Sequence, residues 1–265
     1  MELEKYPPFV KYQRIPHLAE VMSILRDKVS IYEKLDGGNV QIRNHNGRIL
    51  AGNRSSYLTD KFVRSKAHIL ECRWFGDFLK WASGNYSFYN LPEDKIVFGE
   101  WLAKHTLDYN LENMNKFYVL DVFDLEKERF IPYENASKLL NNLGLEDVRF
   151  LSLIFKGKIR YEELERLVDK SDYRNGKAEG LVIKNYDSQE FAKLWERTVN
   201  RKKRALSYED VKKIIMTMVE SDMLITRENV IQEMEEDYTN QKINYSDNEL
   251  RKMVNKYFDD PASLY

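Results

Sequence analysis

The hydrophobic pattern divides this chain into two parts with different periodicities. Up to about residue 200, short strand-like runs of apolar residues are interspersed with stretches of helical periodicity. The predicted strands cover residues 39–43, 48–52, 95–102, 117–125, 180–184 and 191–195, and the predicted helices cover residues 18–28, 66–82, 134–143 and 161–170. This mixture predicts an α+β domain built on antiparallel sheet.

From Ser207 onward the pattern is helical throughout. N-capping side chains stand at Ser207, at Thr226, and at Ser246, which has Glu249 three residues later. The apolar residues at helical spacing behind these caps are Val211, Ile214, Ile215, Met218 and Val219, then Val230, Ile231 and Met234, and finally Leu250, Met253, Val254, Tyr257 and Phe258. We therefore predict a larger domain at residues 1–204 and a small all-helical C-terminal domain at residues 205–265.

Composition narrows the class of protein. Hydrophobic residues make up 43% and aromatic residues 13% of the 265 residues, which predicts a globular chain. No apolar run approaches transmembrane length, and the amino terminus lacks a secretory signal pattern. Cys72 is the single cysteine, and the four histidines show no metal-ligand spacing, which argues against disulfides and zinc chemistry. We expect a cytoplasmic protein, acting as a monomer and without a membrane partner.

Charge is distributed unevenly between the two predicted domains. Residues 205–265 carry 7 basic and 13 acidic residues, whereas residues 1–204 carry 35 basic and 30 acidic residues. The larger domain is therefore the one suited to a polyanion. The densest basic cluster consists of Arg197, Arg201, Lys202, Lys203 and Arg204. It is a candidate for contacts with nucleic-acid phosphates, and a solvated linker explains it equally well.

The segment Lys34-Leu35-Asp36-Gly37 places a lysine at the corner between a strand and a turn. Apolar and β-branched residues flank Gly37 and Gly38, which predicts two short strands with Lys34 pointing into a cleft. A lysine amine attacks phosphorus when it is deprotonated, and burial or nearby cations favour that state. Taken alone, the segment is better explained as an exposed lysine beside a hairpin turn.

Further charged residues follow in or beside predicted strands. Arg54 lies just after a strand, Glu100 interrupts an apolar strand, Glu179 precedes a strand that ends at Lys184, and Lys193 lies within another. Each would ordinarily be a solvent-facing residue. Together they supply what a triphosphate site needs, namely cations for the phosphates and carboxylates for a divalent metal or a ribose.

This ordered set closely resembles the covalent nucleotidyltransferase superfamily, which includes ATP-dependent DNA ligases, RNA ligases and mRNA capping enzymes. Residues 34–37 resemble motif I, 98–102 motif III, 117–124 motif IIIa, 179–184 motif IV and 191–195 motif V. The resemblance implies an antiparallel-sheet, ATP-grasp-like nucleotidyltransferase domain. Helices replace the OB-fold that commonly follows motif V in DNA ligases and capping enzymes. The helical C-terminal region, together with Asn39 shortly after motif I, favours the RNA ligase branch, particularly the phage-type RNA ligase 2 group.

The resemblance also implies a mechanism and a set of roles. Lys34 would attack the α-phosphate of ATP to form lysyl-AMP, the AMP would pass to an RNA 5′-phosphate, and an RNA 3′-hydroxyl would displace it. We expect this reaction to serve RNA repair. The implied roles are adenine contact for Glu33, phosphate or metal contact for Asn39, ribose and 5′-phosphate contact for Arg54 and Glu100, metal binding for Glu179 with Glu100, and phosphate neutralisation for Lys184 and Lys193. Mg²⁺ is the expected ion, with Mn²⁺ as a substitute.

Two positions depart from the family pattern and leave alternatives open. The base-stacking residue of motif IIIa is either Leu120, before Asp121, or Phe123, before Asp124. Trp195 stands where motif V often has a second lysine. The competing functions are a minimal DNA ligase, a GTP-dependent capping guanylyltransferase, and a nucleic-acid-binding module that descends from a ligase.

Overall fold

The computed structural model describes residues 6–58, 70–103, 107–145, 147–195 and, towards the C-terminus, 204–205, 211–212, 214–215, 218, 225–238, 243–244 and 247–259. The chain divides into two compact units, residues 1–199 and 200–265. Among the described helices, none is long and apolar enough to cross a membrane.

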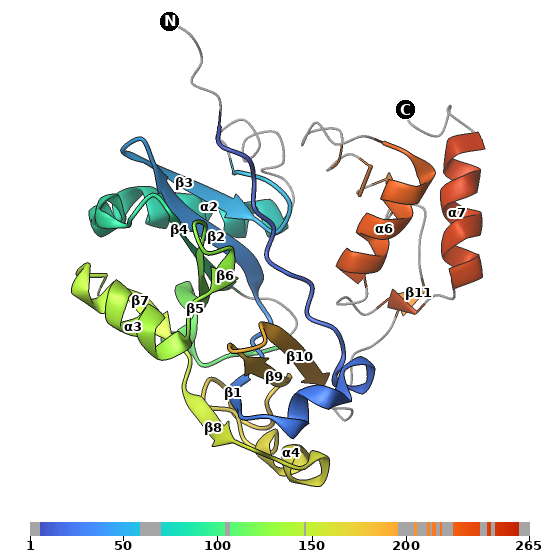
Figure 1. Ribbon diagram of the computed structural model, residues 1–265. Helices are drawn as coiled ribbons and strands as arrows, with labels where there is room; N and C mark the ends of the chain where they lie inside the picture. Colours follow the sequence, from blue (N-terminus) through green and yellow to red (C-terminus); the bar gives the residue numbers. More distant parts are fainter. Residues whose placement is uncertain are drawn as a thin grey trace, which may run out of the picture. The chain divides into compact units, whose positions relative to one another are not determined.

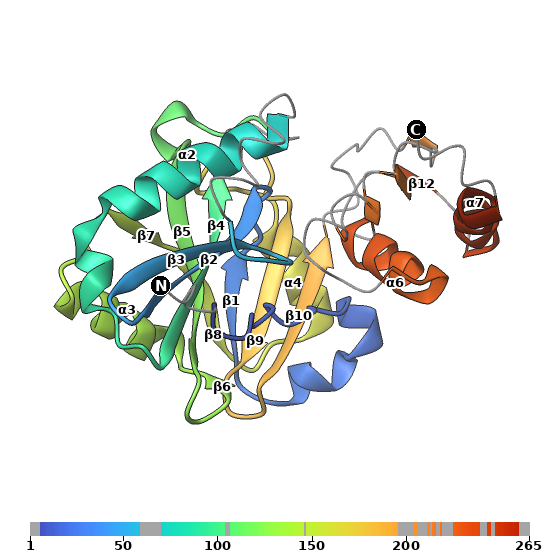
Figure 2. The same ribbon diagram turned by 90° about the horizontal axis from the view of Figure 1, so that it is seen from above.

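The first unit is built on two sheets in which most neighbouring strands are antiparallel (Figures 1 and 2). The smaller sheet has the order β10-β9-β1-β8 and contains β1 (Val29–Glu33), β8 (Leu153–Gly157), β9 (Gly180–Asn185) and β10 (Glu190–Trp195). The larger sheet has the order β3-β2-β4-β5-β6 and contains β2 (Gly38–His45), β3 (Arg48–Asn53), β4 (Lys95–Leu102), β5 (Lys116–Asp124) and β6 (Arg129–Phe130), with β7 (Val148–Phe150) parallel to β5.

Helices cover the sheets of the first unit. Helix α2 (Leu70–Gly84) packs on β2 and β3, α3 (Tyr133–Asn142) packs on β5, and α4 (Tyr161–Leu167) contributes Leu164 to a core on one face of the smaller sheet (Figure 2). The short 3₁₀ helices are η1 (Leu18–Glu20), η2 (Met22–Arg26), η3 (Tyr86–Asn90) and η4 (Leu111–Asn113).

Alternation along the smaller sheet separates two faces. Ile31, Leu181, Ile183 and Ala192 point into the core that contains Leu164. The residues between them therefore point to the opposite face, because successive side chains on a strand alternate. This second face carries Lys184 of motif IV and Lys193 of motif V.

The second unit is formed by α6 (Arg227–Tyr238), α7 (Asp247–Asp259) and the two-residue parallel strands β11 (Arg204–Ala205) and β12 (Ile243–Asn244). The described positions of the first predicted helix are helical, and their apolar side chains are buried in one cluster with those of α6 and α7. Thr226 Oγ1 accepts a hydrogen bond from the Asn229 N–H at 3.1 Å, which confirms the predicted cap. Ser207 and Ser246 lie outside the described residues.

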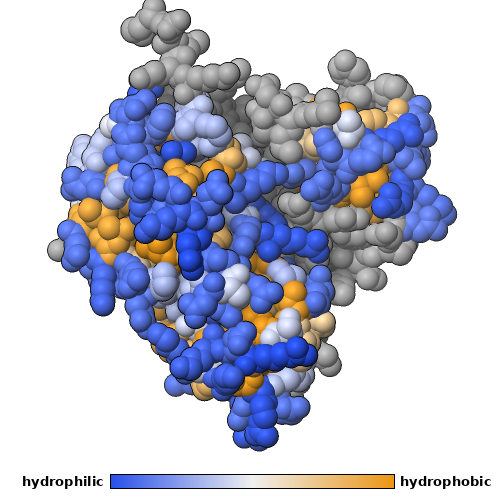
Figure 3. Space-filling model, viewed as in Figure 1, coloured by the Kyte–Doolittle hydropathy of each residue, from blue (hydrophilic) through white to orange (hydrophobic). Residues whose placement is uncertain are grey.

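The observed elements agree with most of the predicted ones. All six predicted strands are present, and the prediction of an α+β unit followed by helices is confirmed. A continuous helix at residues 18–28 was wrong: Val21, with φ −137° and ψ 44°, interrupts it, and strand β1 begins at Val29. Figure 3 shows one surface of the molecule, on which hydrophilic residues predominate and apolar residues form smaller patches.

Candidate functional site

Lys34 follows β1 directly and is fixed to β9 through the backbone. Its N–H donates to the Gly180 carbonyl at 2.9 Å. A Cβ atom on Gly180 would lie 2.1 Å from the Leu194 carbonyl oxygen, so only glycine permits this approach of β9 to β10. The contact brings Lys34 beside Glu179, which is 145 residues away in sequence.

The Lys34 side chain meets a carboxylate and an indole ring. Its Nζ donates to Glu179 Oε2 at 3.0 Å, and the Glu179 side chain is only 1% exposed. The same Nζ lies 5.3 Å from the centroid of the Trp195 ring, and Lys193 Nζ lies 5.6 Å from that ring. Two ammonium groups therefore lie within reach of one aromatic ring, which offers each a cation–π contact.

The residues after Lys34 attach the smaller sheet to the larger one. The Gly37 N–H donates to Glu100 Oε1 at 3.0 Å, and the Asp36 N–H donates to the Tyr109 hydroxyl at 2.7 Å. A Cβ atom on Gly37 would lie 2.6 Å from the Trp101 carbonyl oxygen, so glycine is required here as well. Asn39, on β2, pairs with Glu100 on β4. The motif I loop is thereby held between the carboxylates Glu179 and Glu100.

Cations gather around the buried Lys193. Burial lowers its pKa to about 8, with repulsion from Lys34, Arg54 and Arg14 acting in the same direction. Arg54 lies in a turn in which Asn53 Oδ1 accepts hydrogen bonds from the Ser55 and Ser56 N–H groups, at 2.8 and 2.9 Å. A site that gathers this much positive charge is suited to phosphate groups.

Glu33 is buried beside a loop that follows α4. The Ser171 hydroxyl donates to Glu33 Oε1, and the Asp172 N–H donates to Oε2 at 3.0 Å. Burial raises the pKa of Glu33 to about 7, and the hydrogen bonds from Ser171 and Asp172 oppose part of that rise. The carboxyl therefore titrates near neutral pH in the folded protein.

This raised pKa predicts a pH-dependent stability. Folded Glu33 holds its proton up to about pH 7, whereas the unfolded group loses it near 4.5. The contribution of Glu33 to the free energy of unfolding is therefore fully present below about pH 4.5. It is lost as pH rises through about 7, a change on the order of 3 kcal/mol. Urea unfolding of wild type and Glu33→Gln, followed by tryptophan fluorescence, should show wild type losing stability relative to the variant between pH 5 and 8. All four tryptophans lie in residues 1–199. A stability difference independent of pH would contradict the assignment.

Lys184 has different partners from those expected for a phosphate-binding lysine. It is fully buried, and its Nζ donates to Asp121 Oδ2 at 2.7 Å and to the Leu120 carbonyl at 2.8 Å. Aromatic rings surround this ammonium group, at centroid distances of 5.3 Å for Tyr32 and Phe191, 5.8 Å for Tyr133 and 6.0 Å for Tyr186. Burial lowers the Lys184 pKa and Asp121 opposes that shift. Lys184 therefore forms a buried ion pair with Asp121, and its expected contact with phosphate stays a prediction.

Asp121 connects this ion pair to the segment after β9 and to the N-terminal segment. It accepts hydrogen bonds from the Tyr186 hydroxyl, at 2.7 Å, and from the Tyr12 hydroxyl. The sequence singled out neither tyrosine nor Asp121 as functional. The available signal was the position of Asp121 in an apolar strand. A carboxylate buried at such a position needs a charged or hydrogen-bonding partner, so the sequence could have indicated a buried pair here.

The two candidates for base stacking occupy different places on β5. Phe123 packs edge-on against Phe130, with ring centroids 5.1 Å apart. It pairs with Ile96 on β4, which is four residues, or about 14 Å, along that strand from Glu100. Leu120 lies at a bulge opposite Phe98 and Gly99, two residues along β5 from Tyr118, which pairs with Glu100. Leu120 is therefore nearer to Glu100 along the sheet than Phe123 is, and which of the two stacks on the base stays a prediction.

The basic cluster after motif V is only partly described. Arg197, Arg201, Lys202 and Lys203 lie outside the described residues, and Arg204 is described only as the first residue of β11. Their proposed contact with nucleic acid therefore remains a prediction.

Glu179 and Glu100 supply carboxylate oxygens to the motif I loop from the two sheets. Among the described residues, no group of three or more His, Cys, Asp or Glu side chains could hold a metal ion. Mg²⁺ is commonly bound through one or two carboxylates and substrate phosphates, with several waters retained. The donor set therefore fits a divalent ion that arrives with a nucleotide.

Comparisons with known proteins give consistent results. A family model described as RNA ligase matches residues 27–204. Two mutant structures of Naegleria gruberi RNA ligase match in fold. The apo form has a TM-score of 0.56 at 18% identity and covers 73% of this chain and 57% of that chain; the form with ATP and Mn has a TM-score of 0.54 at 18% identity and covers 73% and 58%.

A curated relative is also similar in sequence. An uncharacterized protein of Methanocaldococcus jannaschii is 26% identical over 162 residues, which is 61% of this chain and 38% of that protein. The chain thus spans well under two thirds of the length of the relatives it matches.

Proposed function

The chain belongs to the RNA ligase family, and from that premise we propose that it is an ATP-dependent enzyme that joins RNA 3′-hydroxyl and 5′-phosphate ends. The observation that carries the proposal is the position of Lys34. Its amine emerges from a glycine-lined corner between two sheets, 3.0 Å from Glu179 and facing the ring that Lys193 also faces. A lysine held among carboxylates and cations in this way is suited to attack a phosphate.

The first step forms a covalent intermediate on the enzyme. Lys34 Nζ loses its proton to solvent and forms a bond to the α-phosphorus of ATP, while the bond from that phosphorus to pyrophosphate breaks and pyrophosphate leaves with the electron pair. Glu179 orients Nζ before the nucleotide binds. The positive charges of Lys193 and Arg54 stabilise the phosphate oxygens, where charge increases in the transition state.

Two further steps transfer AMP and join the strands. The RNA 5′-phosphate attacks the lysyl-AMP phosphorus and releases Lys34, and the 3′-hydroxyl then attacks the adenylated 5′-phosphate with AMP leaving. Glu33, Asn39 and Leu120 would contact the nucleotide, and Glu100 with Arg54 would hold its ribose and phosphate. Mg²⁺ or Mn²⁺, held by Glu179 and Glu100, would supply additional positive charge to the phosphates.

Lys193 predicts an alkaline limit to the first step. Its pKa of about 8 means that the free enzyme loses this charge as pH rises through 8. The kcat/KM for ATP should therefore fall above about pH 8, because this parameter reports groups of the free enzyme. Arginine keeps its charge throughout this range, so Lys193→Arg should move the decline to higher pH, whereas Lys193→Met should lower the rate and remove the decline. If kcat/KM for ATP falls over the same pH range in Lys193→Arg as in wild type, Lys193 does not cause the decline.

Sealing assays test the proposed function. Purified enzyme would be incubated with ATP and Mg²⁺ on nicked duplex RNA, nicked duplex DNA and single-stranded RNA carrying 5′-phosphate and 3′-hydroxyl ends. We expect ATP-dependent sealing of RNA. Sealing confined to DNA would favour a minimal DNA ligase. Nucleotide attachment from GTP alone would favour a capping guanylyltransferase, and no reaction at all would favour a binding module.

The remaining expectations form part of the same proposal. Residues 1–204 would be the adenylylation domain, and residues 205–265 would be a helical domain that serves the RNA. The basic residues Arg197, Arg201, Lys202, Lys203 and Arg204 would contact RNA phosphates. We propose a cytoplasmic monomer that acts in RNA repair.

A further inference from the structure

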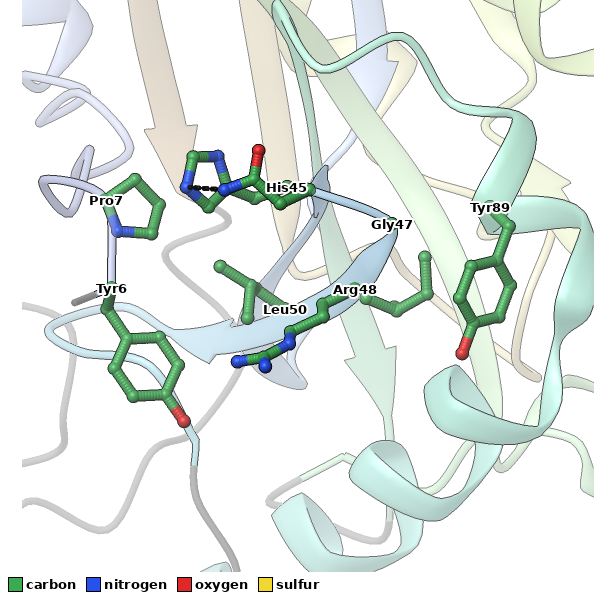
Figure 4. A pocket seen from close by; sticks show the side chains of 9 residues that line it. Tyr6, Pro7, His45, Gly47, Arg48, Leu50 and Tyr89 are labelled. Atoms are coloured by element: carbon green, nitrogen blue, oxygen red, sulfur yellow. Dashed lines mark hydrogen bonds between the residues drawn. The ribbon is translucent and has the colours of Figure 1, made fainter. Parts of the chain in front are cut away.

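A groove lies at the hairpin end of β2 and β3, at the opposite end of β2 from Lys34. Its volume is about 320 Å³, and it is lined by Tyr6, Pro7, His45, Asn46, Gly47, Arg48, Ile49, Leu50 and Tyr89 (Figure 4). The volume falls at the lower end of the range of ligand pockets, about 300 to 1,000 Å³. This groove has no part in the site around Lys34.

The lining combines aromatic rings with a cation. Tyr6 is 55% exposed and Tyr89 45% exposed, and in Figure 4 the Arg48 side chain extends between these two rings. His45 and Asn46 add hydrogen-bonding groups at the hairpin turn, and none of the described residues that line the groove is acidic. Exposed aromatic rings beside a positive charge are typical of surfaces that bind single-stranded nucleic acid, where bases stack and the cation meets the backbone.

The hairpin that forms the groove is rigidly built. Asn46 and Gly47 both have positive φ, 50° and 68°, which is the conformation of a tight two-residue hairpin turn. The Asn46 N–H donates to Glu93 Oε1 at 3.0 Å, and Asn44 Nδ2 donates to the carbonyls of Tyr89 and Leu91, at 2.9 and 3.1 Å. These bonds hold the segment carrying Tyr89 against the hairpin, so the two sides of the groove keep a fixed separation.

We propose that this groove binds a nucleotide of the RNA substrate away from the ligation junction, with a base stacked on the tyrosines and a phosphate at Arg48. The inference rests on the proposed function. Strand β2 joins the two places directly, because Gly38 lies beside the motif I loop and His45 lines the groove. Seven residue steps of about 3.4 Å separate them by about 24 Å. A stacked strand rising about 3.4 Å per nucleotide spans that distance with about seven nucleotides.

The proposal predicts a dependence on RNA length. The double variant Arg48→Ala/Tyr89→Ala should raise the KM for RNA with 20 nucleotides flanking the junction by about ten-fold or more, since each stacked base contributes substantially to affinity. The KM for substrates with four nucleotides on either side should not change, nor should the rate of AMP attachment from ATP. Arg160→Ala is the matched control, because Arg160 is an arginine with an 81% exposed side chain on another face of the fold, before α4.

A photo-crosslink gives a second measurement. 4-Thiouridine placed about seven nucleotides from the junction should crosslink to the hairpin peptide, and the same nucleotide placed two residues from the junction should not. An unchanged KM for long RNA in the double variant, together with no crosslink, overturns the groove proposal. The proposed function would still stand in that case if ATP labels the enzyme and short RNA is sealed. An equal loss on short and long substrates overturns it too, because it would indicate a small-molecule site. Failure of AMP attachment in wild type would instead contradict the proposed function.

Discussion

Replacing Lys34 with alanine is expected to abolish ATP-dependent RNA sealing. The side chain is itself a reactant, and removal of an enzyme nucleophile can lower turnover by about 10⁶-fold. Lys34→Arg should be equally inactive, because a guanidinium keeps its charge and is not a nucleophile. The measurement is sealing of 5′-phosphate RNA in the presence of ATP.

A substrate that bypasses the first step provides the control for this variant. RNA supplied already adenylated at its 5′ end does not need lysyl-AMP, so Lys34→Ala should still join it to a 3′-hydroxyl. Sealing of both substrates by Lys34→Ala would show that another residue carries the nucleotide. Loss of both, with an unchanged unfolding midpoint, would show that Lys34 acts in strand joining as well.

Replacing Asp121 with alanine is expected to cause the largest loss of stability. The change removes the acidic partner of a buried ammonium group, and breaking a buried ion pair in this way costs about 3–5 kcal/mol. It also deprives the Tyr12 and Tyr186 hydroxyls of their acceptor. Urea unfolding monitored by tryptophan fluorescence at pH 7 measures the loss.

A double variant separates the ion pair from simple cavity formation. Asp121→Ala/Lys184→Met removes both charges, and the aromatic rings around Lys184 accept an apolar side chain, so stability should recover substantially relative to Asp121→Ala. If Asp121→Ala loses less than about 1 kcal/mol, or if the double variant is no more stable than the single one, the ion pair does not have the assigned role.

The sequence was sufficient for the elements that local pattern determines. Alternation and apolar runs identified β4, β5, β9 and β10, and the cap at Thr226 marked the start of α6. Motif order identified Lys34 and Glu179 as members of one site, and the structure places their side chains 3.0 Å apart.

Features that depend on distant contacts were not predictable from the sequence. A lysine at the end of a strand looks the same whether it meets water or packs inside, and Lys184 is buried only because rings from β1, α3, β10 and the segment after β9 surround it. The raised pKa of Glu33 arises in the same way, from burial beside a loop 138 residues away. The break at Val21 was missed because its apolar neighbours have helical spacing while its backbone does not.

The most direct test of the central claim is to locate the nucleotide on the protein. Wild-type enzyme, first freed of bound AMP with pyrophosphate, would be incubated with ATP and Mg²⁺, denatured, digested and mapped by mass spectrometry. The account predicts AMP in an acid-labile bond on the peptide containing Lys34, and its disappearance when 5′-phosphate RNA is added before denaturation. AMP on any other residue, or none on a preparation that seals RNA with ATP, would contradict it.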